Sequence, residues 1–283
     1  VYDDRWMKVV SDLYRTYADW EPHLRLREPV AEVAIVYSQA AARHYARSRS
    51  RELVDSPIAG FYQALLEDRT LFELVHADTL SAGSLDRYRS VVLPNVATLA
   101  EAQAQVIRDY VHAGGGLVAT LESSRYDERG RLRSDFALAD LFGAHAADAA
   151  VQAPLKNSYI AVNHEADVVD RPVIHRGLAD AGRVINGGAR VPVTAGAGTP
   201  TGPYSLVPPY PDLPMEEVYP REVRDDCPEV FHTVAGAGRV VYIASDLDRS
   251  FWEMLTPDHG RILANSVRWT CRREPLVEVI GPG

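Results

Sequence analysis

The sequence predicts an α/β domain whose sheet is doubly wound and mainly parallel, with a long proline-rich excursion. Through the first half of the 283 residues, short apolar runs alternate with helical patterns, which is typical of a parallel sheet with helices on both faces. The composition, 46% hydrophobic and 24% charged, excludes collagen, coiled coil and disorder. The length fits two average domains or one large α/β domain, and we expect one core.

The charge balance excludes two classes of partner. Thirty Lys and Arg against 39 Asp and Glu give a net charge of −9, which repels a nucleic-acid backbone and an anionic membrane. No apolar run approaches the ~20 residues that span a bilayer, and no signal peptide is visible. The chain has only two cysteines, Cys227 and Cys271, which favours a reducing compartment, so we expect a cytoplasmic protein. The sequence leaves open whether these two cysteines form one disulfide bond. Because the chain begins at Val1, we expect a segment of a longer protein.

An amphipathic helix is predicted over the first twenty residues. Large apolar residues recur there at spacings of three and four, and Glu21-Pro22 ends the pattern. This stripe consists of Trp6, Val9, Val10, Leu13, Tyr17 and Trp20. A helix with two tryptophans on one face requires a partner surface, either in this domain or upstream of it.

The βα alternation begins after this helix. The apolar run at 30–37 predicts a buried parallel strand, and the Arg-rich stretch at 44–51 predicts a loop or a frayed helix. Ser56 and Pro57 begin the next helix, with serine as its cap, and it continues through Leu66. Further strands are predicted at 71–76, 88–94 and 117–120.

A helix with a capping box precedes the strand at 117–120. Thr98 and Glu101 fit the box, and Val106, Ile107, Tyr110 and Val111 form the inner stripe. Glycines 114–116 follow the helix and precede a strand. Phosphate-binding loops have the reverse order, strand before helix, so these glycines indicate a helix C-cap.

The alternation weakens beyond Gly143. Strands are predicted at 159–162, 191–194 and 239–244. The proline-rich stretch 200–220 is expected to hold no regular structure and to form an extended arm or a long ordered loop. Thr256-Pro257 caps a closing helix, whose inward residues are Ile262, Leu263, Ser266, Val267 and Trp269 or Thr270.

Polar residues follow the predicted parallel strands, where open α/β sheets bind their ligands. These residues are Ser38, Gln39, Asn95, Glu122, Ser123, Ser245, Asp246 and Asp248. We take Ser38, Gln39, Asn95, Glu122, Ser123 and Asp246 as candidate ligand-binding residues of a crevice at this edge. Trp252 and the tyrosines of the proline-rich stretch are candidate stacking surfaces for a sugar.

No catalytic residue, metal or cofactor is predicted. Glu122 as a base with Ser123 as a nucleophile is one hypothesis, but the nine histidines are scattered, and hydrogen bonding within the loop is the alternative. His164, Glu165 and Asp167 are metal-ligand types, yet they lie in a predicted loop without a second cluster, which favours a solvated turn.

Several stretches in order resemble the β-galactosidase trimerisation domain, an amidotransferase-like module that follows the TIM barrel of some glycoside hydrolases. The resemblance covers roughly residues 30 to 272. It is carried by residues 33–38, 60–65, 92–95, 114–120, 122–130, 136–143, 238–242, 246–252 and 265–269.

This resemblance implies a flavodoxin or class I glutamine amidotransferase-like fold and a non-catalytic assembly role. The catalytic glutamates would lie in an upstream TIM barrel, and the domain would form a homo-oligomer, expected to be a trimer. Residues 1–29 would be a leading helix and linker from that upstream domain, 30–272 the module itself, and 273–283 a tail towards a further domain. The alternatives are a module that binds a carbohydrate or another small polar ligand at the crevice, and the Ser/Glu hydrolase.

Overall fold

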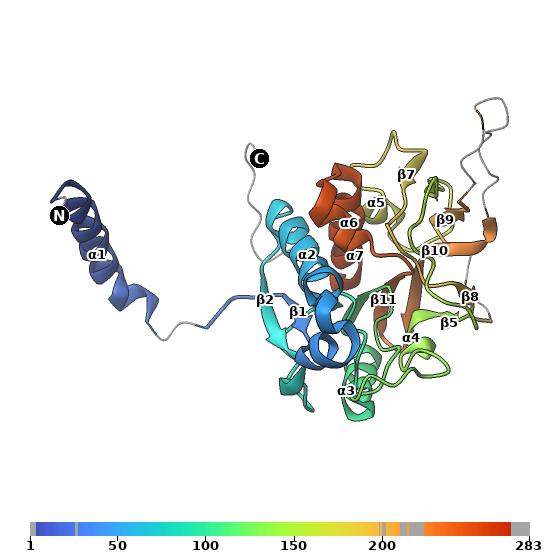
Figure 1. The fold of residues 1–283 in the computed structure, drawn as a ribbon, viewed down its shortest axis with the longest axis horizontal. Helices are drawn as coiled ribbons and strands as arrows, with labels where there is room; N and C mark the ends of the chain where they lie inside the picture. Colours follow the sequence, from blue (N-terminus) through green and yellow to red (C-terminus); the bar gives the residue numbers. More distant parts are fainter. Residues whose placement is uncertain are drawn as a thin grey trace. The chain divides into compact units, whose positions relative to one another are not determined.

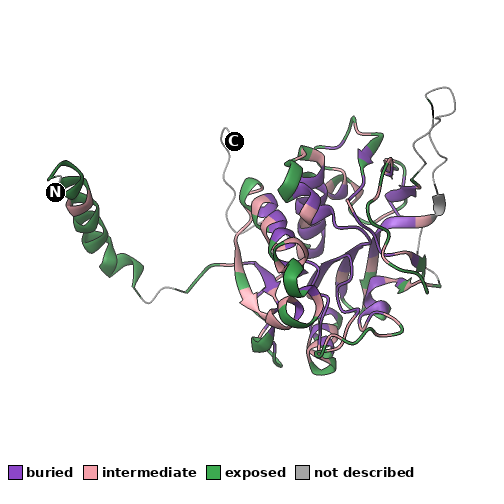
Figure 2. Ribbon diagram, viewed as in Figure 1, coloured by how far each residue is buried: buried purple, intermediate pink, exposed green. Residues whose placement is uncertain are grey.

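The computed structural model describes residues 4–25, 28–197, 199, 202–209, 214 and 224–272, with the side chains of 224–226 left out. The chain divides into two compact units, Val1–Val30 and Ala31–Gly283. The first unit contains helix α1 (Asp4–Leu24), which has no buried residue (Figure 2). The helix does not end at Pro22 as predicted, because a proline in the last turn removes only one hydrogen bond from an end that already lacks some.

The second unit contains a nine-stranded sheet in the order β2-β1-β3-β4-β11-β10-β9-β6-β7 (Figure 1). Its first five strands are mutually parallel. They are β1 (Val33–Tyr37), β2 (Phe72–His76), β3 (Ser90–Leu93), β4 (Gly116–Thr120) and β11 (Gly238–Ile243). The predictions of a mixed α/β fold and of these five strands are therefore confirmed.

The other four strands of the sheet are antiparallel, which the sequence did not indicate. They are β10 (Arg224–Ala235), β9 (Tyr204–Val207), β6 (Tyr159–Val162) and β7 (Arg183–Ile185). A separate pair consists of β5 (Ala144–Ala146) and β8 (Val193–Ala195).

The prediction that the proline-rich stretch 200–220 holds no regular structure is wrong at β9. Its four residues lie between Pro203 and Pro208 and contain no proline, so their amides can pair with β6 and β10. Residues 200–201, 210–213 and 215–220 of the predicted excursion lie outside the described residues.

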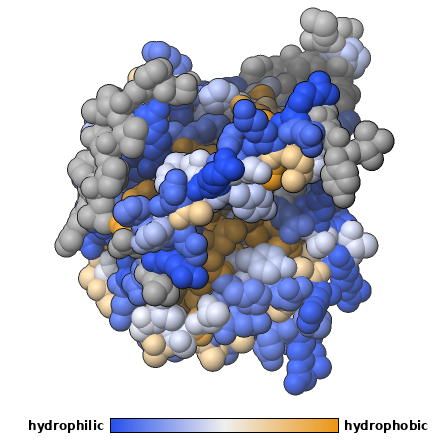
Figure 3. Space-filling view, turned by 90° about the vertical axis from the view of Figure 1, so that its left-hand side faces the viewer, coloured by the Kyte–Doolittle hydropathy of each residue, from blue (hydrophilic) through white to orange (hydrophobic). Residues whose placement is uncertain are grey.

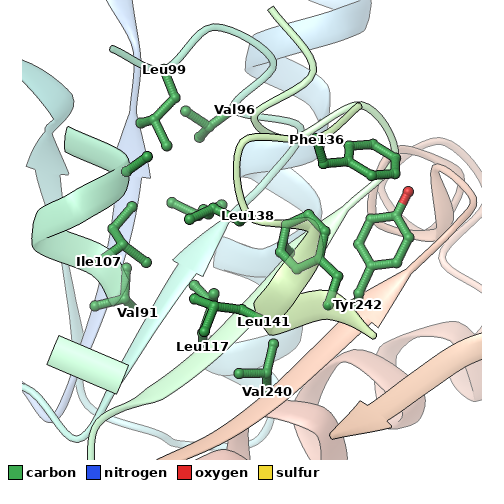
Figure 4. Close-up of a cluster of buried hydrophobic side chains, with 14 of the residues drawn as sticks. Val91, Val96, Leu99, Ile107, Leu117, Phe136, Leu138, Leu141, Val240 and Tyr242 are labelled. Carbon is green, nitrogen blue, oxygen red and sulfur yellow. The ribbon is translucent and has the colours of Figure 1, made fainter. Parts of the chain in front are cut away.

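Helices cover both faces of the sheet (Figure 1). Helices α2 (Ser56–Glu67), α6 (Leu247–Met254) and α7 (Pro257–Cys271) pack on one face, and α3 (Glu101–His112) and α4 (Ala139–Phe142) pack on the other. A further short helix is α5 (Arg171–Ile174). Alternate strand residues face the two layers: Val91 and Leu117 join the α3 cluster of Figure 4, whereas Val92 and Val118 join the α7 cluster.

The predicted helix caps are replaced by other contacts. Residues Ala41–Asp55 form consecutive π-helical and 3₁₀ turns that lead directly into α2, so the loop predicted at 44–51 is helical and Ser56 caps nothing. At α3, the side chain of Gln103 accepts the Ala100 amide at 2.9 Å, and the predicted box residue Thr98 instead contacts Ser38. Thr256 precedes α7 without a side-chain cap bond.

Candidate functional site at the strand ends

The carboxyl ends of the parallel strands bring Asn95 and Glu122 together. Asn95 donates its backbone amide to Thr120 Oγ1 at 2.9 Å, and its Oδ1 accepts the Glu122 amide at 3.2 Å. Its Nδ2 donates to the carbonyl oxygen of Leu53 at 2.8 Å. Asn95 therefore joins β3, β4 and the helical segment 41–55, which lies over this end of the sheet.

The Glu122 carboxylate is buried and bonded to two tyrosines. Tyr45 donates to Oε2 at 2.5 Å and Tyr126 donates to Oε1 at 3.0 Å, and their rings lie 5.0 Å apart. Burial, together with the neighbouring Glu122 carboxylate, raises the pKa of both phenols well above the ordinary value. These tyrosines therefore remain neutral donors that hold Glu122 as an acceptor.

The two candidate serines are used within the fold. The Ser123 hydroxyl is fully buried, with the carbonyl oxygens of Leu93 and Thr120 as acceptors at 2.9 and 2.8 Å. Ser38 Oγ accepts the Ala41 amide at 3.1 Å. In the described part of the chain, the hydrogen bonds of Ser123 and Glu122 involve no histidine, so the geometry gives no support to a Ser/Glu hydrolase.

The other two candidates lie apart from this group. Gln39 accepts the Tyr37 hydroxyl at 3.4 Å. Asp246 accepts the Ala189 amide at 2.8 Å and pairs with Arg249 at 2.5 Å. Burial raises the pKa of Asp246, and Arg249 opposes this rise. Arg249 also contacts Glu52, which ties this corner to the segment 41–55.

Asp248 is the most strongly perturbed carboxyl group at this end. It is fully buried, its Oδ2 accepts the Thr120 hydroxyl at 2.6 Å, and its Oδ1 accepts the Arg249 amide at 2.8 Å. Burial raises its pKa from 3.8 to about 7, although both hydrogen bonds favour the charged form.

Replacing Asp248 with asparagine should change how stability depends on pH. Between pH 3.8 and about 7 the folded chain holds a proton that unfolded Asp248 releases, so wild-type stability falls as pH rises there. The loss is at most about 1.4 kcal/mol per pH unit. The Asp248→Asn variant has no titrating group at this position and therefore lacks this pH-dependent loss. The free energy of unfolding of the variant minus that of the wild type should therefore increase with pH.

Urea unfolding of both proteins from pH 4.5 to 7.5 measures this difference. Buried His232, whose pKa is lowered to about 3 by burial, gives a slope of opposite sign, but it is present in both proteins and cancels. A difference that stays constant with pH contradicts the buried, proton-holding Asp248.

Sequence reasoning missed the groups that cover the strand ends. Tyr45 and the Leu53 carbonyl lie in or beside the Arg-rich stretch that was expected to be a loop, and Tyr126 follows the strand-end loop. The spacing of Ala42, Tyr45 and Ala46 by three and four was the available signal for a helical segment, and these residues pack in a small cluster with Val54. Cys227 and Cys271, whose pairing the sequence left open, are free thiols.

Within the described residues, no group of three or more His, Cys, Asp or Glu side chains is arranged to hold a metal ion. No helix in that part of the chain is long and apolar enough to cross a membrane.

The fold and this end of the sheet define a mixed α/β module with a largely parallel central sheet. Residues 31–169 match the family described as the β-galactosidase trimerisation domain, which confirms the resemblance derived from the sequence. That segment is therefore assigned to this family. The comparison with curated proteins found no match.

Solved structures of glycoside hydrolases contain a similar fold. The chain is similar to the β-galactosidase of Bacillus circulans sp. alkalophilus, with a TM-score of 0.61 and 17% identity over 88% of this chain and 32% of that one. It is also similar to a GH42 β-galactosidase from G. stearothermophilus, with a TM-score of 0.61 and 18% identity over 89% of this chain and 33% of that one. A third similar structure is α-L-fucosidase isoenzyme 2 of Paenibacillus thiaminolyticus, with a TM-score of 0.66 and 15% identity over 95% of this chain and 37% of that one. The chain thus spans 32% to 37% of these proteins, and at such identities the likeness concerns the fold alone.

Proposed function

We propose that this α/β domain is a non-catalytic assembly domain that joins copies of a glycoside hydrolase into a homo-oligomer, a trimer. The family description of residues 31–169 supports this role. The strand ends support it as well, because Asn95, Glu122 and Ser123 direct their hydrogen bonds to neighbouring groups of the chain. The observation that carries the proposal is an exposed apolar surface on α2, β2 and α6.

This assembly surface consists of six large apolar residues that are 44% to 56% exposed: Tyr62, Leu66, Leu74, Trp252, Met254 and Leu255. Four of its neighbours, Tyr37, Asp55, Ile58 and Ala59, line a groove of about 400 Å³ together with Tyr62, Leu74 and Trp252. Figure 3 faces the side on which α2 and β2 lie in Figure 1, and hydrophobic side chains gather near the centre of that face. Exposed apolar surface of this kind, gathered around a groove, commonly marks a protein interface.

The topology explains why this surface is left open. β2 is an edge strand, paired only with β1 in the described sheet. The connection from β2 to β3 places Ala77, Leu80 and Leu85 in the cluster on the α3 face. On the opposite face α2 covers Phe72, whose ring meets that of Tyr62 at 5.1 Å, while Leu74 remains 56% exposed. Exposed edge strands are sites of strand and subunit association.

Replacing Leu74 with lysine should separate the subunits. A lysine in the middle of an apolar contact must be desolvated or must open the interface, so the oligomer should dissociate to the 31.2 kDa monomer at micromolar concentration. Light scattering after gel filtration measures the mass. Leu132→Lys is the matched control, because Leu132 is 62% exposed and lies outside the assembly surface.

The two variants test whether the assembly surface is the interface between subunits. If the wild type is an oligomer and Leu74→Lys keeps its mass, the interface lies elsewhere. If Leu132→Lys dissociates equally, the effect is not specific to the assembly surface.

We further propose the domain organisation that the resemblance implies. Residues 1–29 would lead from an upstream TIM-barrel domain that holds the catalytic glutamates, 30–272 would form the assembly domain, and 273–283 would lead onward. The exposed apolar face of α1, which includes Trp6, Leu13 and Trp20, supports contact with another domain. The parallel strand order β2-β1-β3-β4-β11 supports a flavodoxin or amidotransferase-like ancestry.

A further inference from the structure

A cavity of about 490 Å³ lies at the opposite end of the sheet from the strand-end residues. It is lined by Glu32 and Arg89, which precede β1 and β3, by Arg239 at the start of β11, and by Arg268 and Arg272 at the end of α7. Its volume is within the range of small-molecule sites, about 300–1,000 Å³. This end of the sheet is not where ligands usually bind in open α/β folds, so its chemistry must be read from the side chains present.

Five arginines line the cavity, and three of them are neutralised by carboxylates. Arg89 pairs with Glu32 at 2.7 Å, Arg239 with Asp170 at 2.6 Å, and Arg268 with Asp68 at 2.8 Å. These three guanidinium groups are mostly buried, with side-chain exposures of 12% to 23%. Ion pairs of this kind fix the shape of the wall but leave no net charge there.

The other two arginines, Arg176 and Arg272, give the cavity its positive charge. Both residues are exposed, and neither forms an ion pair within the described part of the chain. The Arg176 backbone carbonyl accepts Asn265 Nδ2 at 2.9 Å, and Arg272 donates to the carbonyl of Ala237, so both residues are anchored. In a chain of net charge −9, two such guanidinium groups at one cavity attract small anions.

The remaining wall is mostly apolar, with Thr70 as a polar exception. Pro172, Val173 and Val267 line it, and Trp269 lies beneath Arg239, whose guanidinium carbon is 4.9 Å from the ring centroid. A small site with mostly apolar walls and two guanidinium groups that have no carboxylate partner among the described residues matches a molecule that carries one oxyanion on a compact body. Arginine forms paired, charge-assisted hydrogen bonds to phosphate and carboxylate oxygens.

We propose that this cavity binds a small phosphate- or carboxylate-bearing molecule, with Arg176 and Arg272 contacting its anionic group. The ion-paired Arg89, Arg239 and Arg268 shape the site, and the apolar wall contacts the body of the ligand. Binding here is independent of the proposed assembly role, since none of the cavity residues belongs to the assembly surface.

Calorimetric titration of the 283-residue chain tests this proposal, with glucose 6-phosphate as the probe and glucose as its neutral counterpart. We expect heat of binding for the phosphate ester alone, and an affinity that falls as NaCl is raised because the contacts are ionic. The double variant Arg176→Gln/Arg272→Gln should raise the dissociation constant by about tenfold or more. Arg261→Gln is the matched control, because this exposed α7 arginine pairs with Asp258 and does not line the cavity.

Thermal unfolding of each variant shows whether the fold is intact. Because Arg176 and Arg272 are exposed, their replacement should leave the unfolding temperature unchanged. The proposal is overturned by no heat with the phosphate ester, by equal binding of glucose, or by an unchanged dissociation constant in the folded double variant. Equal weakening by Arg261→Gln overturns it too, because the effect then reflects net charge rather than the cavity.

Discussion

Replacing Gly60 with alanine is expected to destabilise the domain by roughly 3 kcal/mol or more, because it inserts a methyl group where two helices touch. A Cβ at this position would lie 2.0 Å from the carbonyl oxygen and 2.6 Å from the carbonyl carbon of Asp248. Both atoms belong to the backbone of α6, so no side-chain rotation relieves the clash and α2 must move away from α6. That movement also disturbs buried Asp248 and its bond to Thr120.

Urea unfolding monitored by circular dichroism measures this loss. Gly182→Ala is the matched control, since a Cβ there meets no atom within 4 Å, and we expect its stability to change by less than about 1 kcal/mol. A Gly60→Ala variant as stable as Gly182→Ala would show that α2 and α6 are not in backbone contact.

Removing the carboxylate of Glu229 is expected to cost about 3–5 kcal/mol, because it leaves the buried Arg190 cation unpaired. Glu229 is fully buried on β10, and its oxygens accept Arg190 Nε at 3.1 Å and Asn186 Nδ2 at 3.1 Å. In Glu229→Leu both donors lose this acceptor, and the Arg190 side chain, only 5% exposed, cannot reach bulk water. Neither donor has another carboxylate partner in the described contacts.

The double variant Glu229→Leu/Arg190→Met separates charge from packing. Because the second change removes the stranded cation, the double variant should be more stable than Glu229→Leu alone, a non-additive result. Glu165→Leu is the surface control: its pair with Arg171 is exposed, and such pairs contribute about 1 kcal/mol or less. Additive losses at Glu229 and Arg190 would contradict a desolvated ion pair.

The parallel half of the fold could be predicted because four of its five strands, β1, β3, β4 and β11, are buried on both faces. Apart from Tyr37 and Ser90, β1 and β3 consist of Val, Ala, Ile and Leu, and nearly every residue in them is buried, so their sequences carry a strong signal. In the antiparallel half only β6 was predicted, at 159–162, and the structure confirms it; β7, β9 and β10 lack such a signal. In β7 only Val184 is buried, and β10 contains Asp225, Asp226 and Pro228, a composition more typical of loops.

The strand-end residues could be located from topology, but not their contacts. The ends of parallel strands share one edge, and this rule correctly places Asn95 beside Glu122. Whether such polar groups face a ligand or one another depends on what covers them. Here Tyr45 comes from an irregular helical segment whose arginines suggested a loop, and its hydroxyl occupies one oxygen of Glu122.

The central claim, that the domain assembles copies of its parent enzyme, is tested most directly by the absolute mass of the wild-type chain. Light scattering over a concentration series should give about 94 kDa, three times the chain mass of 31.2 kDa, without change on dilution. A mass of 31.2 kDa at every concentration would contradict self-association through this domain.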